Sequence, residues 1–184
     1  MKNNPQINNF LDVGIKRFAD RGIDGIRIDE MCDEVGVAKT SFYHYFGSKN
    51  SFVEKLFDYW YDISTGGIYD QIKHIDDALL RFTALKKLID SNKDAEYCYL
   101  QLKLYASNNE YARKIVDNAK KKRFEILFEI FKMAGQSDEE ATSNVRKMIL
   151  TFFGRLALTH GYTGNTIDID IPQEELMQFL GLKK

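Results

Sequence analysis

The chain has 184 residues, of which 44% are hydrophobic and 29% charged, and its formal net charge is −1 at pH 7. This composition excludes a disordered chain and leaves room for one sizeable core or for two smaller domains. No apolar run approaches the length of a membrane span, and the first residues lack the cationic and apolar regions of a signal peptide, so we expect a cytoplasmic protein. Because positive and negative charges nearly balance, any affinity for nucleic acid has to come from a local patch.

The first predicted helix carries a single apolar stripe with a period of 3.6 residues. Its members are Ile7, Phe10, Leu11, Gly14, Ile15, Phe18 and Ala19, and Pro5 lies before them. The glycines of residues 21–26 interrupt this helix.

Residues 31–46 have the pattern of two short helices separated by a glycine turn. Met31, Cys32 and Val35 stand at helical spacing, Gly36 ends the first helix, and Val37 is an apolar plug between the two. In the second helix, two phenylalanines four residues apart share one face, and hydrogen-bonding side chains occupy the others: Lys39, Thr40, Ser41, Tyr43, His44 and Tyr45. This is the layout of a helix-turn-helix that reads DNA; the alternative is that the aromatics only pack and the preceding acidic helix faces solvent.

Helical patterns continue along the rest of the chain, and no strand pattern competes with them. Ser48 is a plausible N-cap for a fourth helix that carries Phe52, Leu56 and Trp60. After a break at residues 66–67, apolar spacing predicts helices at about 75–90, 94–106, 109–134, 137–162 and 172–181. A capping box marks the start near residue 137, where Ser137 is followed three residues later by Glu140. We therefore predict an all-α protein.

The predicted helix at 137–162 is apolar on more than one side, so a single neighbour cannot cover it. We expect one face to pack inside the subunit and another to meet a second copy, with a homodimer contact at Phe153, Gly154, Ala157 and Leu158. A helix buried in a larger monomer core is the alternative.

Aromatic residues are abundant in the later helices and predict a pocket for a small, largely apolar ligand. The candidate lining residues are Trp60, Phe82, Tyr99, Tyr105, Phe128 and Phe152. An ordinary aromatic core explains the same pattern.

Metal, cofactor and catalytic sites are not predicted. Cys32 and Cys98 support neither a disulfide framework nor a metal cluster, and we expect buried thiols. His74 and His160 have no ligand partners at metal spacing. The sequence also lacks a nucleophile elbow, a phosphate-cradling glycine loop and a dinucleotide fingerprint, which argues against an enzyme.

Residues 10–60 resemble the DNA-binding domain of the TetR family of transcriptional regulators. The resemblance rests on Phe18, Ala19, Gly22, Gly25, Val35, Gly36, Val37, Phe42, Tyr43, His44, Tyr45, Phe46, Ser48 and Lys49. It implies a three-helix helix-turn-helix domain at 1–47 and a larger helical domain at 48–184 for ligand binding and dimerisation, linked by the helix from about 48 to 65. It also implies that Tyr43 and Lys49 grip phosphate.

Two positions depart from the family pattern. Relatives commonly have a Ser or Thr cap where this chain has Arg27 and again where it has Ala38, so a cap worth about 1 kcal/mol is missing before the second short helix. Asp29 and Glu30 would repel phosphate if they lie near DNA, and Arg27 is expected to offset them by contacting the DNA backbone.

The helix-turn-helix pattern and the apolar helix at 137–162 predict a sequence-specific DNA-binding regulator that binds a near-palindromic double-stranded operator as a dimer. The resemblance to the TetR family further implies a ligand-responsive repressor. The predicted DNA-binding residues are Arg27, Lys39, Thr40, Ser41, Tyr43, His44, Tyr45 and Lys49. Lys39 and Thr40 are the first candidates for reading bases, followed by His44. The alternative is a helical ligand-binding or protein-interaction module that has lost operator binding.

Overall fold

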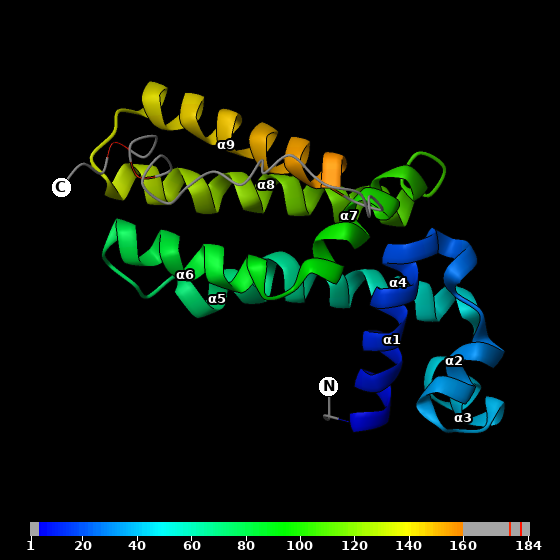
Figure 1. Ribbon diagram of the computed structural model, residues 1–184. Helices are drawn as coiled ribbons and strands as arrows, with labels where there is room; N and C mark the ends of the chain where they lie inside the picture. The colour runs from blue at the N-terminus through cyan, green and yellow to red at the C-terminus, as the bar shows by residue number, and fades with distance from the viewer. Residues whose placement is uncertain (1–3, 160–176, 178–180, 182–184) are drawn as a thin grey trace. The chain divides into compact units, whose positions relative to one another are not determined.

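The computed structural model describes residues 4–159, together with 177 and 181, and this part of the chain is helical without strands (Figure 1). The predicted all-α class is therefore confirmed. The elements are α1 (Pro5–Arg21), a 3-10 turn (Gly22–Gly25), α2 (Ile28–Val35), α3 (Lys39–Phe46), α4 (Lys49–Tyr61), a π segment (Asp62–Gly66), α5 (Gly67–Ile72), α6 (Ala78–Asp90), α7 (Lys93–Tyr105), α8 (Glu110–Met133) and α9 (Asp138–Thr159). No helix among the described residues is long and apolar enough to span a membrane.

The chain divides into two compact units. Unit 1 comprises Met1–Gly67 and Asn92–Ala119, and unit 2 comprises Ile68–Ser91 and Lys120–Lys184. The first ten residues of α8 belong to unit 1 and the rest to unit 2. These units do not correspond to the predicted DNA-binding domain at 1–47 and ligand-binding domain at 48–184, whose boundary stays a prediction.

Helix α1 forms where the apolar stripe predicts it. Phe10, Leu11, Ile15, Phe18 and Ala19 are all buried. Helix α1 begins at Pro5, which the sequence analysis placed before the helix. The side chain of Asn4 caps this start by accepting a hydrogen bond from the Gln6 amide.

Unit 1 is held together by an aromatic core. Its largest fully buried side chains include Phe10, Phe18, Phe42, Phe52, Phe57 and Trp60. Helices α1 and α4 pack closely at Gly14, where an added Cβ would lie 2.8 Å from the side chain of Leu56 and 2.9 Å from the ring of Phe52. Both cysteines are buried free thiols, as expected.

The predicted break at Gly66 and Gly67 is wrong. The chain instead continues from α4 through the π segment directly into α5, a helix that the sequence reading did not predict. The two glycines permit close approach: a Cβ on Gly66 would lie 2.9 Å from the ring of Tyr61, and one on Gly67 would lie 2.8 Å from the carbonyl oxygen of Asp62. Glycine here fits the wider turn of a π-helix and does not end the helix.

Unit 2 packs around a second apolar cluster that joins α5, α6, α8 and α9. Its buried members are Ile68, Ile72, Phe82, Leu85, Ile126, Ile130, Phe131, Ala141 and Val145. The buried Arg81 of α6 donates to the carbonyl of Ile75 (2.7 Å) and to the carboxylate of Glu129 on α8 (3.3 Å), so its charge is paired inside the unit.

The predicted helix ends agree with the structure where capping residues mark them. Ser48 accepts a hydrogen bond from the Ser51 amide at the start of α4. The capping box before α9 is present, since the Ser137 hydroxyl accepts from the Glu140 amide and the Ser137 amide donates to the Glu140 carboxylate. The predicted helix at 172–181 falls almost entirely outside the described residues.

Candidate nucleic-acid interface

Helix α3 has one buried face and one open face. Phe42 and Phe46 are buried. Their rings lie 5.5 and 5.6 Å from the ring of Phe10 on α1, and 5.3 and 4.8 Å from the ring of Phe52 on α4. Such edge-to-face and tilted ring pairs fix the rotation of the helix about its axis. The opposite face of α3 is consequently presented outward in a defined orientation.

The open face of α3 carries side chains that can form hydrogen bonds. Thr40 and His44 are exposed, and the side chain of Tyr43 is 44% exposed. Thr40 and Tyr43 are three residues apart, and His44 follows, so the three lie within one turn and a half of helix. The exposed face of α3 is therefore polar, and the opposite face is anchored by buried phenylalanine rings.

The turn before α3 is set by Gly36 and Val37. Gly36 has φ 75° and ψ 37°, a left-handed conformation that glycine adopts without strain, and its amide donates to the end of α2. The Val37 amide also donates to the carbonyl of Cys32. As the sequence predicts, neither Arg27 nor Ala38 supplies a side-chain cap.

The residues after α3 form a second potential contact. Gly47 has φ 74° and turns the chain into α4, whose first residue, Lys49, is exposed. The start of α4 presents free amide protons and the positive end of the helix dipole, which favour an anion.

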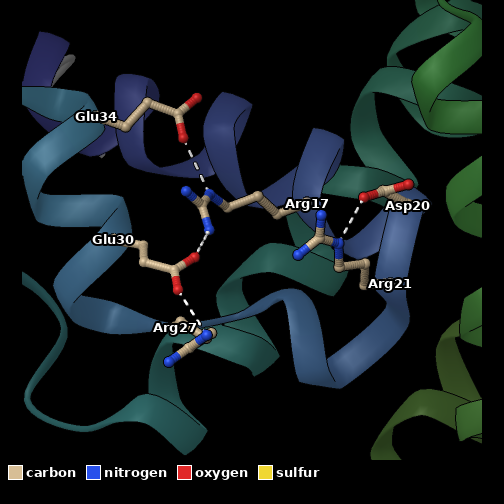
Figure 2. A network of polar contacts seen from close by, with 6 residues as sticks. All are labelled: Arg17, Asp20, Arg21, Arg27, Glu30 and Glu34. Carbon is tan, nitrogen blue, oxygen red and sulfur yellow. Dashed lines mark hydrogen bonds and ion pairs between the residues drawn. The ribbon is translucent and has the colours of Figure 1, made fainter.

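Two acidic residues of α2, Glu30 and Glu34, are paired with arginines (Figure 2). Arg17 of α1 reaches Glu30 at 2.6 Å and Glu34 at 3.0 Å, and Arg27 reaches Glu30 at 2.7 Å. The hydrogen bond from Arg17 holds the pKa of Glu30 below its ordinary value, so this carboxylate stays charged and bound. The predicted repulsion of phosphate by Glu30 is thus reduced by two guanidinium groups.

Asp29 is paired separately, with the first residue of α3. Its carboxylate lies 2.6 Å from the ammonium of Lys39. The hydrogen bond with Asp29 raises the pKa of Lys39, which remains protonated. The principal cation of the predicted reading helix is therefore already in contact with an anion.

The predicted DNA-binding residues fall into two groups. Exposed side chains are those of Arg27, Lys39, Thr40, Tyr43, His44 and Lys49. Ser41 and Tyr45 are partly buried, and the hydroxyl of Tyr45 donates to the side-chain oxygen of Gln6 on α1. The structure brings the residues from 39 to 49 together on α3 and the start of α4, whereas Arg27 stands at the start of α2, two residues before Asp29.

Sequence reading missed the residues that position this surface. Arg17 lies on the same helix as the apolar stripe, and no local pattern links it to carboxylates 13 and 17 residues away. Lys55 of α4 is a further example, since its ammonium donates to the carbonyl of Tyr45 (3.4 Å) and lies 5.5 Å from the centre of the Phe46 ring. Both cations attach a neighbouring helix to the motif.

The predicted pocket residues are divided between the two units. In unit 1, Trp60 stacks on Tyr99 with ring centres 5.9 Å apart, and its indole donates to the carbonyl of Ala95. Tyr105, also in unit 1, packs against Phe18 and Phe57. The others belong to unit 2, where Phe82 is part of the core, Phe128 stacks on Phe124, and Phe152 contacts Phe153. Trp60, Phe82 and Tyr99 are buried, and Tyr105, Phe128 and Phe152 are partly buried. The role of these rings as a pocket stays a prediction.

The predicted dimer residues lie on the outer side of α9. Gly154, Ala157 and Leu158 are exposed, and Phe153 is partly buried. A Cβ on Gly154 would meet nothing within 4 Å. Leu150, which was not among the predicted residues, extends this apolar side with 73% exposure.

A family model described as bacterial regulatory proteins, tetR family, matches residues 10–56, the segment from α1 to α4. No curated protein sequence matches the chain. Among solved structures, a protein from Saccharomonospora viridis assigned as a transcriptional regulator, in complex with choline, is similar with a TM-score of 0.73 at 16% identity, covering 96% of this chain and 94% of its own. A TetR transcriptional regulator from Legionella pneumophila has a TM-score of 0.72 at 13% identity, with coverages of 98% and 96%.

A third similar structure is AibR in complex with isovaleryl coenzyme A and operator DNA. Its TM-score is 0.62 at 16% identity, with coverages of 96% and 97%. At these identities the three structures establish a shared fold over nearly the whole chain.

Proposed function

We propose that the chain is a member of the TetR family of transcriptional regulators and acts as a ligand-responsive repressor. The family model over residues 10–56 and the shared fold support this proposal. In this proposal it binds a near-palindromic DNA operator as a homodimer, acts in the cytoplasm and catalyses no reaction. The observation that carries the proposal is the open polar face of α3 above the buried Phe42 and Phe46.

The open face of α3 has the size and chemistry for the major groove. A helix fits a groove about 12 Å wide, and base edges there offer both donors and acceptors. Lys39, Thr40 and His44 are proposed to reach base edges, with Lys39 and Thr40 as the primary readers. Ser41 and Tyr45 are secondary candidates, because both are partly buried.

Phosphate contacts are assigned to groups that flank the reading face. Tyr43 and Lys49 are exposed on α3 and at the start of α4, where free amide protons add an electrostatic attraction for phosphate. Arg27 is proposed to contribute while it remains paired with Glu30. Such contacts fix the register of the protein on DNA, whereas base contacts select the sequence.

The proposed division of labour follows the predicted boundaries. Residues 1–47 read DNA, residues 48–184 bind a ligand and dimerise, and the helix from about 48 to 65 links them. The exposed apolar side of α9, with Gly154, Ala157 and Leu158, supports the dimer contact. Two reading helices placed about 34 Å or a multiple apart on one side of a duplex require two half-sites related by a two-fold axis.

The proposed ligand is small and largely apolar. Similar structures contain choline in one case and isovaleryl coenzyme A in another, which supports ligand control without identifying the ligand of this chain. A ligand that favours a dimer with wrongly spaced reading helices lowers operator affinity by shifting the population.

The deciding experiment is a gel-shift series with the purified full chain. The probes are a duplex that the wild-type protein enriches from a random pool and a scrambled duplex of the same composition, each across a range of salt concentrations. We expect the enriched duplex to bind more tightly at every salt concentration, because base contacts add to phosphate contacts. Equal affinity for both duplexes defeats specific readout, and a salt slope of about −0.9 per phosphate then reports backbone binding alone.

Paired substitutions separate this proposal from its rival, a helical binding module without operator affinity. Tyr43→Ala combined with Lys49→Ala removes two phosphate contacts and is expected to weaken binding of both duplexes and to flatten the salt slope. Lys103→Ala, at an exposed position on α7, is the matched control and leaves DNA binding unchanged. If the wild-type chain binds neither duplex, the rival holds.

A further inference from the structure

Three carboxylates of α2 form ion pairs of two different kinds. Glu30 and Glu34 bind Arg17, whose side chain is only 24% exposed, and together they attach α2 to α1. Asp29 is 74% exposed and its partner Lys39 is 52% exposed, so their pair stands on the surface where α2 meets the start of α3. The pairs with Arg17 therefore connect two packed helices, whereas the pair between Asp29 and Lys39 is exposed on the surface proposed to meet DNA.

Lys39 occupies an electrostatically unfavourable position. It is the first residue of α3, where the helix dipole disfavours a cation, and Ala38 provides no side-chain cap. Asp29 brings a negative charge to this position from the first turn of α2. The pair therefore neutralises the Lys39 charge and restricts the direction of its side chain.

A lysine whose charge is neutralised by a carboxylate interacts differently with DNA phosphates and with DNA base edges. Its ammonium has three donors, of which Asp29 occupies one and leaves two for other acceptors. A phosphate approaching the pair meets the nearby Asp29 carboxylate and gains little net attraction. The O6 and N7 atoms of guanine are uncharged acceptors, so a base edge can bind the remaining donors without that repulsion.

We propose that Asp29 is a specificity-determining residue, which makes Lys39 a donor for base edges by cancelling its attraction for phosphate. This inference rests on the proposed function, since it assigns a role within the same DNA surface. Asp29 itself acts through Lys39 and is a positioning residue.

The test is Asp29→Asn, which removes the charge and keeps the shape of the side chain. The released Lys39 then counts as one more phosphate-neutralising cation on the scrambled duplex, so the salt slope there steepens by about 0.9. Because of this steeper slope, a fourfold decrease in salt concentration should raise the affinity of Asp29→Asn for scrambled DNA about threefold more than it raises that of the wild type. Affinity for the enriched duplex rises less, because Lys39 is engaged with a base there, and the ratio of specific to non-specific affinity falls.

Asp33→Asn is the matched control, since Asp33 is exposed one helical turn further along α2 and the substitution makes the same change in net charge. It measures the general effect of removing an acidic residue near DNA, and we expect it to leave the affinity ratio unchanged. Asp29→Glu keeps a carboxylate and is expected to retain the wild-type ratio. Thermal unfolding of each variant confirms that the fold is intact.

A double-mutant cycle identifies the route of the effect. In a Lys39→Gln background, Asp29→Asn is expected to act no more strongly than Asp33→Asn, because its partner is gone. An equal effect of Asp29→Asn with and without Lys39 overturns the inference, as does an unchanged affinity ratio in Asp29→Asn alone. A wild-type chain that does not discriminate between the two duplexes overturns the proposed function as well, so the two failures are distinguishable.

Discussion

Helices α3 and α9 each have an open outer face, and the chemistry of the two faces differs. The open face of α3 carries Thr40, Tyr43 and His44, which form hydrogen bonds. That of α9 carries the apolar Leu150 and Leu158, with Gly154 between them. A polar face suits a hydrated, charged partner such as DNA, whereas an exposed apolar face suits contact with another protein surface.

The two helices also differ in how their outer faces are supported. Behind the face of α3 lies a buried cluster of phenylalanine rings that fixes its rotation. Helix α9 is held on its inner side by the smaller Ala141 and Val145, within a cluster that includes Phe131. A reading surface depends on the precise orientation of individual side chains, and an apolar contact surface depends mainly on area and shape.

The largest expected effect comes from removing the support behind α3. Phe42→Ala deletes a ring that contacts four other rings and leaves a cavity, which is expected to lower the free energy of unfolding by about 3–5 kcal/mol. Urea unfolding followed by circular dichroism measures the loss, and DNA binding should disappear with it. Leu104→Ala, at an exposed leucine on α7, is the control and is expected to change stability by no more than about 0.5 kcal/mol. Similar losses in the two variants would contradict the assigned interior position of Phe42.

The next effect concerns the outer face of α9. Gly154→Leu places a side chain where an added Cβ meets no atom within 4 Å, so the fold of the subunit should be retained. In the proposed dimer, the same side chain blocks close approach of the two copies, and we expect the dimer to dissociate at least about tenfold more readily, a change of about 1.4 kcal/mol. Sedimentation velocity over a concentration series measures the dissociation constant. Thr83→Leu, which introduces the same side chain at an exposed position on α6, is the matched control. An unchanged dissociation constant in Gly154→Leu would exclude this face of α9 from the dimer interface.

Local sequence patterns were sufficient to predict both helices and the buried side of α3. Phe42 and Phe46 stand four residues apart, and that spacing alone places them on one face of a helix. The capping box at Ser137 was also readable, because both of its members lie within four residues.

Features that depend on contacts across the fold could not be read in this way. Arg17 binds carboxylates on another helix, and Tyr45, predicted to contact DNA, donates to Gln6, 39 residues away. The glycines at 66 and 67 were interpreted by their usual effect on helices, whereas their contacts with Tyr61 and Asp62 explain why the helix continues. The pocket prediction combined aromatic rings from two units, since aromatic spacing carries no information on which ring meets which.

A smaller effect is expected at the starts of the two helices, which differ in capping. Helix α9 begins with a capping box, whereas Ala38, at the N-cap position of α3, provides no side-chain cap. Ala38→Ser is expected to raise the free energy of unfolding by about 1 kcal/mol, and Ser137→Ala is expected to lower it by a similar amount. Urea unfolding at pH 7 measures both changes. No gain in Ala38→Ser would indicate that the serine hydroxyl fails to reach the amides of α3.

The smallest expected effect is that only the cap of α9 responds to acid. The amide of Ser137 donates to the Glu140 carboxylate at 2.9 Å, which holds the pKa of Glu140 below its ordinary value of 4.5. The folded state therefore takes up this proton less readily than the unfolded state, and the stabilisation is full above pH 4.5 and is lost as the pH falls through the lowered pKa. Glu140→Gln should consequently differ most from the wild type near neutral pH and approach it below pH 4.5 in urea unfolding. At α3, the position that corresponds to Glu140 is held by Ser41, which is not a carboxylate. The gain in the free energy of unfolding of Ala38→Ser should therefore be the same near neutral pH and below pH 4.5. A gain that varies with pH in Ala38→Ser would instead point to a titrating carboxylate near the start of α3.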